Sequence, residues 1–425
     1  MDRMWAAAPI LLAALAGSSV SANGQTPAPA APGQPAVTSA FYARDYARTP
    51  TVAELTSLGR TLFYSPELSA NGRLACASCH DPRYGFAAPN DRPVQRGGAR
   101  LAAEGVRAVP ALRYLQTLPS FAQHRFEEEP DDSQDQGPSG GYTWDGRADS
   151  AHDQARLPLL SAAEMGNPSP SALIRRIRDS ALATPMREVF GPDVFDDPQR
   201  AFDALRWALE VFLQDPATFY PYSSRYDDWL RGRETLSAQE LRGLRLFNDP
   251  RKGNCARCHP SQAFNGAFPQ FTDYGYAALG APRNRAIRAN ADPGYFDLGL
   301  CGPLRQDLRD HPEYCGLFRV PSLRNVAVRR SYFHNGVFHD LREVLQFYAR
   351  RDSEPQRWYS RTSAGRLRVF DDLPRLYWDN IEREPPFGQK PGAPPALTDA
   401  ELDDLLAFLK TLTDADLRSR MPATH

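Results

Sequence analysis

Two copies of the motif Cys-x-x-Cys-His place the strongest constraint on how this chain folds. Each copy puts a histidine directly after its second cysteine, and the six residues are Cys76, Cys79, His80, Cys255, Cys258 and His259. This spacing is typical of covalent c-type haem attachment, in which the thiols form thioethers and the histidine binds the iron. Structural zinc is the alternative, since four cysteines and two histidines could form a metal site. The position of the histidine in both copies favours two covalently bound haems.

The N-terminal residues predict export. Arg3 precedes an apolar run over 5–17 and small residues up to Ala22, which is the pattern of a signal peptide over 1–22. The apolar run is too short for a membrane-spanning helix, although an uncleaved anchor is the alternative. Residues 23–44 are rich in Pro and Ala and predict a flexible lead. We therefore predict a periplasmic protein with no integral membrane span in the mature chain.

The remaining two cysteines fit an oxidising compartment. Cys301 and Cys315 are the only cysteines outside the two motifs, and the stretch between them contains Gly302, Pro303 and Pro312. A disulfide is favoured in an exported chain and would contribute about 3 kcal/mol. Two unpaired thiols are the alternative.

A weak internal repeat predicts two helical domains. Gly59 to Phe63 before the first motif resembles Gly243 to Phe247 before the second. Capping boxes precede both segments and open a final helix, at Thr51/Glu54, Ser237/Glu240 and Thr398/Glu401. Few stretches alternate at period two, so we predict an all-α chain of two cytochrome c-like haem domains with long irregular loops. The domains are expected over 45–215 and 235–420, joined by a linker over 216–234.

The length, net charge and loop composition of the chain add three minor expectations to the predicted two-domain fold. With 425 residues and a net charge of −1, the chain can bury a sizeable core and has no general attraction for nucleic acid, so no such partner is expected. Residues 127–141 are acidic and then rich in Gly, Ser and Pro, which predicts a solvated loop or a docking site for a basic partner. Residues 352–397 carry many prolines and predict an irregular surface excursion.

The segments between and after the motifs resemble a known family over about 50–415. They comprise Trp144 to Arg147, Gln154, Pro158, Glu164 to Gly166, Pro321 to Asn325 and Tyr332 to Gly336. In this combination with the haem motifs, the chain resembles the bacterial di-haem cytochrome c peroxidases and the related MauG proteins.

The resemblance implies roles for three residues at a haem bound by His80. Glu164 would act on hydrogen peroxide as a general acid–base, and Gln154 would shape the pocket together with Pro158. Trp144 would lie between the haems and carry an electron or hole. The alternatives are a surface carboxylate for Glu164 and a core side chain for Trp144.

The sixth ligand of the second haem separates the subtypes. The peroxidases proper use methionine there, but the methionines of this chain are Met1, Met4, Met165, Met186 and Met421. The family position falls at Tyr348, where MauG-type proteins have tyrosine, so the chain is closer to that subtype.

The local pattern agrees with an inward-facing Tyr348. Asp340 predicts a helix start, and Leu341, Val344 and Leu345 would share a face with Tyr348. A phenolate stabilises the higher oxidation states of iron, so such a haem would store oxidising equivalents. A buried tyrosine with its hydroxyl bonded elsewhere is the alternative, and the rival ligands are His311, His334 and His339.

Two further family features are altered. The histidine that blocks the first haem at rest in many relatives falls at Arg96, so we expect a five-coordinate or water-bound first haem, with His124 as the remaining candidate.

The family also places calcium between its domains. The usual Arg-Asn-x-Pro is replaced by Arg107 to Pro110, and Thr-x-Pro by Arg329 to Ser331. Backbone carbonyls could still bind calcium.

Three functions remain open at this stage. The first is a periplasmic peroxidase that reduces hydrogen peroxide with electrons passed from a small redox-protein donor through the second haem. The second is a MauG-like oxidase that uses peroxide to oxidise side chains of a partner protein. The third is a non-catalytic electron carrier with two saturated haems.

Overall fold

The computed structural model describes residues 46–124 and 137–421. The expected signal peptide over 1–22, the lead over 23–44 and residues 127–136 of the acidic segment lie outside the described residues. Within the described ranges no helix is long and apolar enough to cross a bilayer.

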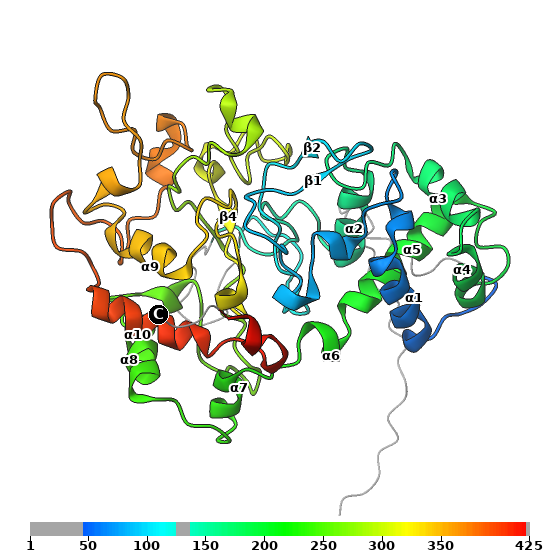
Figure 1. The fold of residues 1–425 in the computed structure, drawn as a ribbon, viewed down its shortest axis with the longest axis horizontal. Coiled ribbons are helices and arrows are strands. Elements are labelled where there is room, and N and C mark those ends of the chain that lie inside the picture. Colours follow the sequence, from blue (N-terminus) through cyan, green and yellow to red (C-terminus); the bar gives the residue numbers. More distant parts are fainter. Residues whose placement is uncertain (1–45, 125–136, 422–425) are drawn as a thin grey trace, which may run out of the picture. The chain divides into compact units, whose positions relative to one another are not determined.

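The expectation of an all-α chain with long irregular loops is confirmed (Figure 1). The α-helices of the described residues are α1 (Val52–Tyr64), α2 (Ala151–Leu160), α3 (Pro170–Arg178), α4 (Ala183–Phe190), α5 (Pro198–Leu213), α6 (Pro216–Phe219), α7 (Arg225–Leu230), α8 (Ala238–Asn248), α9 (Leu341–Arg350) and α10 (Asp399–Lys410). The strands form two short antiparallel pairs, β1 (Arg96–Gly97) with β2 (Ala103–Glu104) and β3 (Tyr276–Ala277) with β4 (Phe318–Arg319).

The three predicted capping boxes begin α1, α8 and α10, with Thr51, Ser237 and Thr398 as the N-cap residues. In each box the hydroxyl accepts the backbone N–H of the N3 glutamate, whose carboxylate accepts the N-cap N–H in return.

The repeat has a physical basis in one glycine per copy. A Cβ atom on Gly59 of α1 would lie 1.9 Å from the backbone oxygen of Ala208 on α5, and one on Gly243 of α8 would lie 2.0 Å from that of Asp404 on α10. Only glycine allows each helix pair to approach this closely. Figure 1 shows α1 beside α5 and α8 beside α10.

Each helix pair contributes to its own hydrophobic core. The first core gathers buried side chains from Leu55 to Phe219, and the second gathers them from Tyr226 to Leu412. The predicted linker over 216–234 contains α6 and α7, and its Phe219 and Tyr226 are buried, one in each core. The domain boundaries stay a prediction.

The proline-rich segment over 352–397 is irregular but is not wholly at the surface. Its Tyr359, Phe370, Leu373 and Ile381 are buried together in a small apolar cluster. Arg351 is fully buried, and its guanidinium lies over the rings of Phe370 and Phe387.

Candidate haem sites

Both Cys-x-x-Cys-His motifs fold as a short 3₁₀ turn, over Cys76–Ser78 and Cys255–Arg257. The backbone N–H of each motif histidine donates to the carbonyl of the first cysteine, at 2.9 Å for His80 and 2.8 Å for His259. All four motif cysteines are free thiols. The described residues contain no group of three or more His, Cys, Asp or Glu side chains that could hold a metal ion, so these cysteines do not converge on a zinc site.

The two motif histidines are oriented alike. Nδ1 of His80 donates to the carbonyl of Phe86 at 2.9 Å, and Nδ1 of His259 donates to that of Phe271 at 2.7 Å. Both phenylalanines have a positive φ, which turns their carbonyls toward the rings. Burial lowers the pKa of each imidazole to about 4. Each ring is therefore neutral at pH 7 and could bind an iron through Nε2, while the Pro110 carbonyl also lies near the ring of His80.

A largely apolar cavity surrounds the second motif. Cys255, Cys258 and His259 line it together with Tyr348 and Trp144. Its walls also include aliphatic side chains of α9 and α10, namely Leu341, Val344, Leu345, Leu405 and Leu409. Apolar walls, two thiols and a neutral histidine suit a covalently attached porphyrin.

Tyr348 lies in this cavity, on α9. Asp340 caps the helix through the N–H of Glu343, as predicted, and Leu341, Val344 and Leu345 are buried on the face they share with Tyr348. Burial raises the pKa of Tyr348, and the nearby thiols of Cys258 and Cys255 raise it further. No hydrogen bond joins the hydroxyl of Tyr348 to another residue of the described ranges.

The rival histidine ligands differ in their placement. His334 lines the cavity, but its ring stacks on Phe318 at 3.6 Å, and its Nε2 lies 3.6 Å from Asp372. His339 is exposed and its Nδ1 contacts the carbonyl of Arg330.

Glu164 lies near the first motif, where its charge acts on Cys76 and Cys79. Its side chain is exposed to solvent, as the alternative of a surface carboxylate expected, although protein atoms surround the carboxyl group closely. Burial raises its pKa, and a hydrogen bond from Ser161 and the charge of Arg147 oppose this. The carboxyl group therefore holds a proton at a higher pH than an ordinary glutamate, as a general acid requires.

Neighbouring glycines fix the loop that carries Glu164. The N–H of Gly98 donates to the Glu164 carbonyl at 2.7 Å, and a Cβ atom on Gly97 would lie 2.4 Å from the Ala163 oxygen. Gln154 and Pro158 precede this loop on α2. Gly97 and Gly98 were not predicted from the sequence, although a Gly-Gly pair is a recognisable signal for close backbone packing.

Trp144 is buried beside the cavity of the second motif. Its Nε1–H donates to the carbonyl of Ala108 at 2.8 Å. The adjacent Asp145 is fully buried, and the Arg107 guanidinium bridges it to Asp297 with contacts of 2.7 Å to each carboxylate. Burial alone would raise the pKa of Asp145, but Arg107 and Arg147 outweigh burial and lower it.

The regions altered from the family pattern hold charged side chains. Arg96 is exposed on β1 and pairs with Glu104 at 2.9 Å, and His124 is also exposed. Arg107 and Arg329 lie in the segments where the family pattern expects calcium, and the described residues give no support for this ion.

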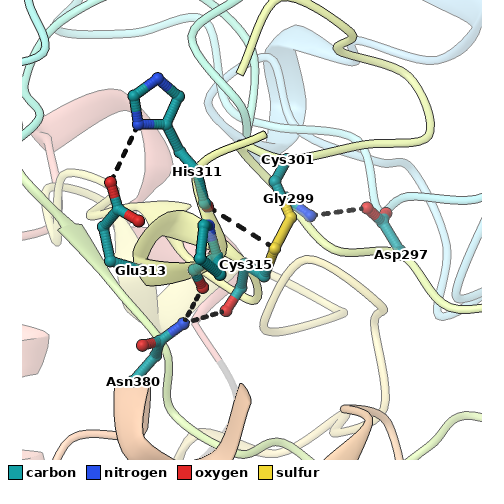
Figure 2. The surroundings of a disulfide bond; sticks show 8 residues. Asp297, Gly299, Cys301, His311, Glu313, Cys315 and Asn380 are labelled. Carbon is teal, nitrogen blue, oxygen red and sulfur yellow. Dashed lines mark hydrogen bonds and ion pairs between the residues drawn. A yellow bond between two sulfur atoms is a disulfide. The ribbon is translucent and has the colours of Figure 1, made fainter. Parts of the chain in front are cut away.

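The predicted disulfide is confirmed. Cys301 and Cys315 are bonded, with their Cα atoms 5.0 Å apart (Figure 2). Asn380 donates to the carbonyls of Pro312 and Cys315, which fixes the loop closed by the bond. His311 lies in this loop and pairs with Glu313, so it is not a ligand in the haem cavity.

Comparison with known proteins agrees with this arrangement. Residues 53–235 match the family described as "Di-haem cytochrome c peroxidase". The methylamine utilization protein MauG of Paracoccus denitrificans is 36% identical over 385 residues, which cover 85% of this chain and 88% of that protein.

Solved structures extend the likeness to the fold. The diheme peroxidase BthA of Burkholderia thailandensis has a TM-score of 0.77 and 40% identity, over 88% of this chain and 89% of its own. A MauG-like protein associated with microbial copper homeostasis has a TM-score of 0.59 and 26% identity, over 88% of this chain and 95% of its own.

Proposed function

Because this chain belongs to the di-haem cytochrome c peroxidase and MauG family, we propose that it is an exported enzyme that reduces hydrogen peroxide to water. The reaction consumes two electrons and two protons for each peroxide. A small redox protein would supply the electrons through the haem at His259, and the haem at His80 would receive the peroxide. A haem held by His80 would supply the redox chemistry, namely electrons for cleaving the O–O bond of peroxide.

The observation that carries this proposal is the placement of Glu164 beside the first motif. Splitting peroxide requires a proton to move from the inner oxygen to the outer one, and a solvent-accessible carboxyl group near Cys76 and Cys79 with a raised pKa suits this transfer. Gln154 would orient the peroxide from α2.

Trp144 would couple the two sites. Its indole lines the cavity of the second motif, and the hydrogen bond to Ala108 fixes its orientation. Asp145 and Arg107 hold the adjacent backbone through buried ion pairs, so the ring has little freedom to move.

A second function is favoured by Tyr348. As a further protein ligand of the haem held by His259, it would stabilise oxidised iron, and that haem would then retain oxidising equivalents. Such an enzyme could oxidise side chains of a partner protein, which is the MauG-like function. BthA is named a diheme peroxidase, so both functions have a relative of comparable similarity.

Export to the periplasm is part of the same proposal. The disulfide is the kind of bond that persists in an oxidising compartment, and the signal pattern over 1–22 supplies the route.

The test uses the purified ferric holoprotein. One high-spin and one low-spin haem in its electron paramagnetic resonance spectrum, together with reaction with peroxide before any reduction, support the enzyme. Two low-spin haems and no reaction would instead indicate an electron carrier. Sustained turnover with a reduced cytochrome or cupredoxin supports the peroxidase. Oxidation that appears only on a trapped partner protein supports the second function.

Glu164→Gln is expected to slow the reaction with peroxide by about 10²–10⁴-fold, because the variant cannot transfer the proton. Glu188→Gln is the matched control, since Glu188 is exposed on α4. Equal rates for both variants would remove Glu164 from the mechanism.

Tyr348→Phe is expected to change the visible spectrum of the second haem and to abolish retention of oxidising equivalents. Tyr359→Phe serves as the control, because its hydroxyl donates to the Gly280 carbonyl and does not line the cavity. An unchanged spectrum in Tyr348→Phe would reject the ligand assignment.

A further inference from the structure

One buried arginine of the described residues differs from the others. Seven arginines are buried, and six of them, Arg113, Arg206, Arg283, Arg305, Arg324 and Arg351, have a carboxylate oxygen within 3.4 Å. Arg319 is 7% exposed, and no carboxylate of the described ranges forms an ion pair with it. A buried cation without a counter-charge is costly, so the missing partner calls for an explanation.

The surroundings of Arg319 are polar but not acidic. Its Nε donates to the carbonyl of Thr143 at 3.1 Å, and the phenol groups of Tyr142, Tyr274 and Tyr276 lie near its guanidinium. Burial lowers the pKa of Arg319, and these tyrosines only partly offset that effect.

Arg329 is only half-buried, but it too has no carboxylate partner among the described residues. Its guanidinium makes two long contacts of 3.4 Å, from Nε to the Ser331 carbonyl and from Nη2 to the Val109 carbonyl. Burial lowers the pKa of Arg329, and Tyr332 is the one group that opposes this effect. Both partners are neutral backbone carbonyl oxygens, so neither supplies a negative charge.

Both arginines line the cavity that contains Cys255, Cys258 and His259. We infer that Arg319 and Arg329 receive the two propionate carboxylates of the haem attached at this motif. A haem carries two such carboxylates, which supplies one counter-charge for each guanidinium, and charge-assisted hydrogen bonds of this kind are strong. The inference rests on the proposed function, because it requires a haem at His259.

The same arginines connect this cavity to the segment of Trp144. The backbone N–H of Arg319 donates to the Trp144 carbonyl at 2.8 Å. Arg329 contacts the carbonyl of Val109, which follows the Ala108 that accepts the indole N–H. They are therefore positioning residues that hold the haem edge and Trp144 in a fixed relation.

The positive charges of Arg319 and Arg329 would also change the reduction potential of the haem attached at the second motif. A cation near a haem disfavours the more positive oxidised state and so raises the reduction potential. The phenolate of Tyr348 acts in the opposite direction. Arg319 and Arg329 would thus limit how far tyrosine ligation lowers the potential.

The test measures the midpoint potential of the second haem in the holoprotein by spectroelectrochemistry. Arg319→Gln and Arg329→Gln should each lower this potential, and the double variant should lower it further. Arg319→Lys and Arg329→Lys keep the positive charge, so the potential of each lysine variant should stay close to that of the parent protein. Arg251→Gln is the control, because the Arg251 side chain is 91% exposed and should leave the potential unchanged.

Three results would overturn the inference. The first is an unchanged midpoint potential in both glutamine variants. The second is a potential that falls as far in the lysine variants as in the glutamine variants. The third is loss of the second haem from glutamine and lysine variants alike. Loss of this haem from the glutamine variants only would support the inference. Mass spectrometry of the parent chain separates the two proposals, since a parent without two attached haems fails the proposed function itself.

Discussion

Glu54 illustrates how one side chain makes the start of a helix depend on pH. Its carboxylate accepts the Thr51 N–H at 2.8 Å and a guanidinium N–H of Arg48 at 2.6 Å, and these bonds lower its pKa from 4.5 to about 2. The folded pKa is the lower one, so the stabilisation is present above pH 4.5 and is lost as the pH falls toward 2. Glu54→Gln should therefore lower the melting temperature at pH 7 and have almost no effect near pH 2. Melting curves at both pH values test this, and a difference that does not change with pH would contradict it.

Residues with local partners could be predicted from the sequence, and residues with distant partners could not. The N-cap at Thr51 and the proposed haem ligand His80 depend on neighbours within a few positions. Arg319 was not singled out from the sequence, because its burial depends on Thr143 and on tyrosines far along the chain. Arg329 was identified only as a departure from the family pattern.

At the scale of helices, the two pairs α1/α5 and α8/α10 depend on the absence of a side chain. Alanine at position 59 or 243 would gain about 1 kcal/mol of helix propensity, but its Cβ would lie within 2.0 Å of a backbone oxygen. The helices must separate, and overpacking costs typically about 1–3 kcal/mol. Gly59→Ala and Gly243→Ala should therefore each lower the free energy of unfolding. Urea denaturation measures this, with Ser57→Ala on the exposed face of α1 as the control, and a stabilised glycine variant would refute the close packing.

Helix starts and helix faces followed from capping residues and apolar spacing, so α1, α8, α9 and α10 were foreseen. The glycines were visible as part of the repeat, but their purpose was not, because it depends on which helix crosses them. The segment over 352–397 was predicted to lie at the surface, and its buried cluster was not foreseen for a related reason. Its composition is rich in proline, whereas the cluster around Phe370 forms only when residues apart in the sequence meet.

At the scale of the whole molecule, ion pairs between the two halves of the chain were the least predictable feature. Arg107 with Asp297 and Arg113 with Asp414 join residues about 190 and 300 positions apart. Neither pair belongs to a motif, and each carboxylate is one of many in the sequence. The haem motifs and the family resemblance predicted the fold class and the cofactor, but not how the halves are held together.

Asp414 offers a direct test of that connection. It is fully buried and accepts hydrogen bonds from Arg113 at 2.9 Å, from the Tyr114 hydroxyl at 2.6 Å and from Asn325 at 2.7 Å. Asp414→Ala leaves the buried Arg113 without this partner, and breaking such a pair costs about 3–5 kcal/mol. Asp416→Ala is the matched control, because Asp416 pairs with the same arginine at 2.7 Å but is 55% exposed, and an exposed pair contributes about 0–1 kcal/mol. Scanning calorimetry of the holoprotein should show a large loss of stability and separate melting of the two halves for Asp414→Ala alone. Equal, small effects of both substitutions would mean that the halves are joined by other contacts.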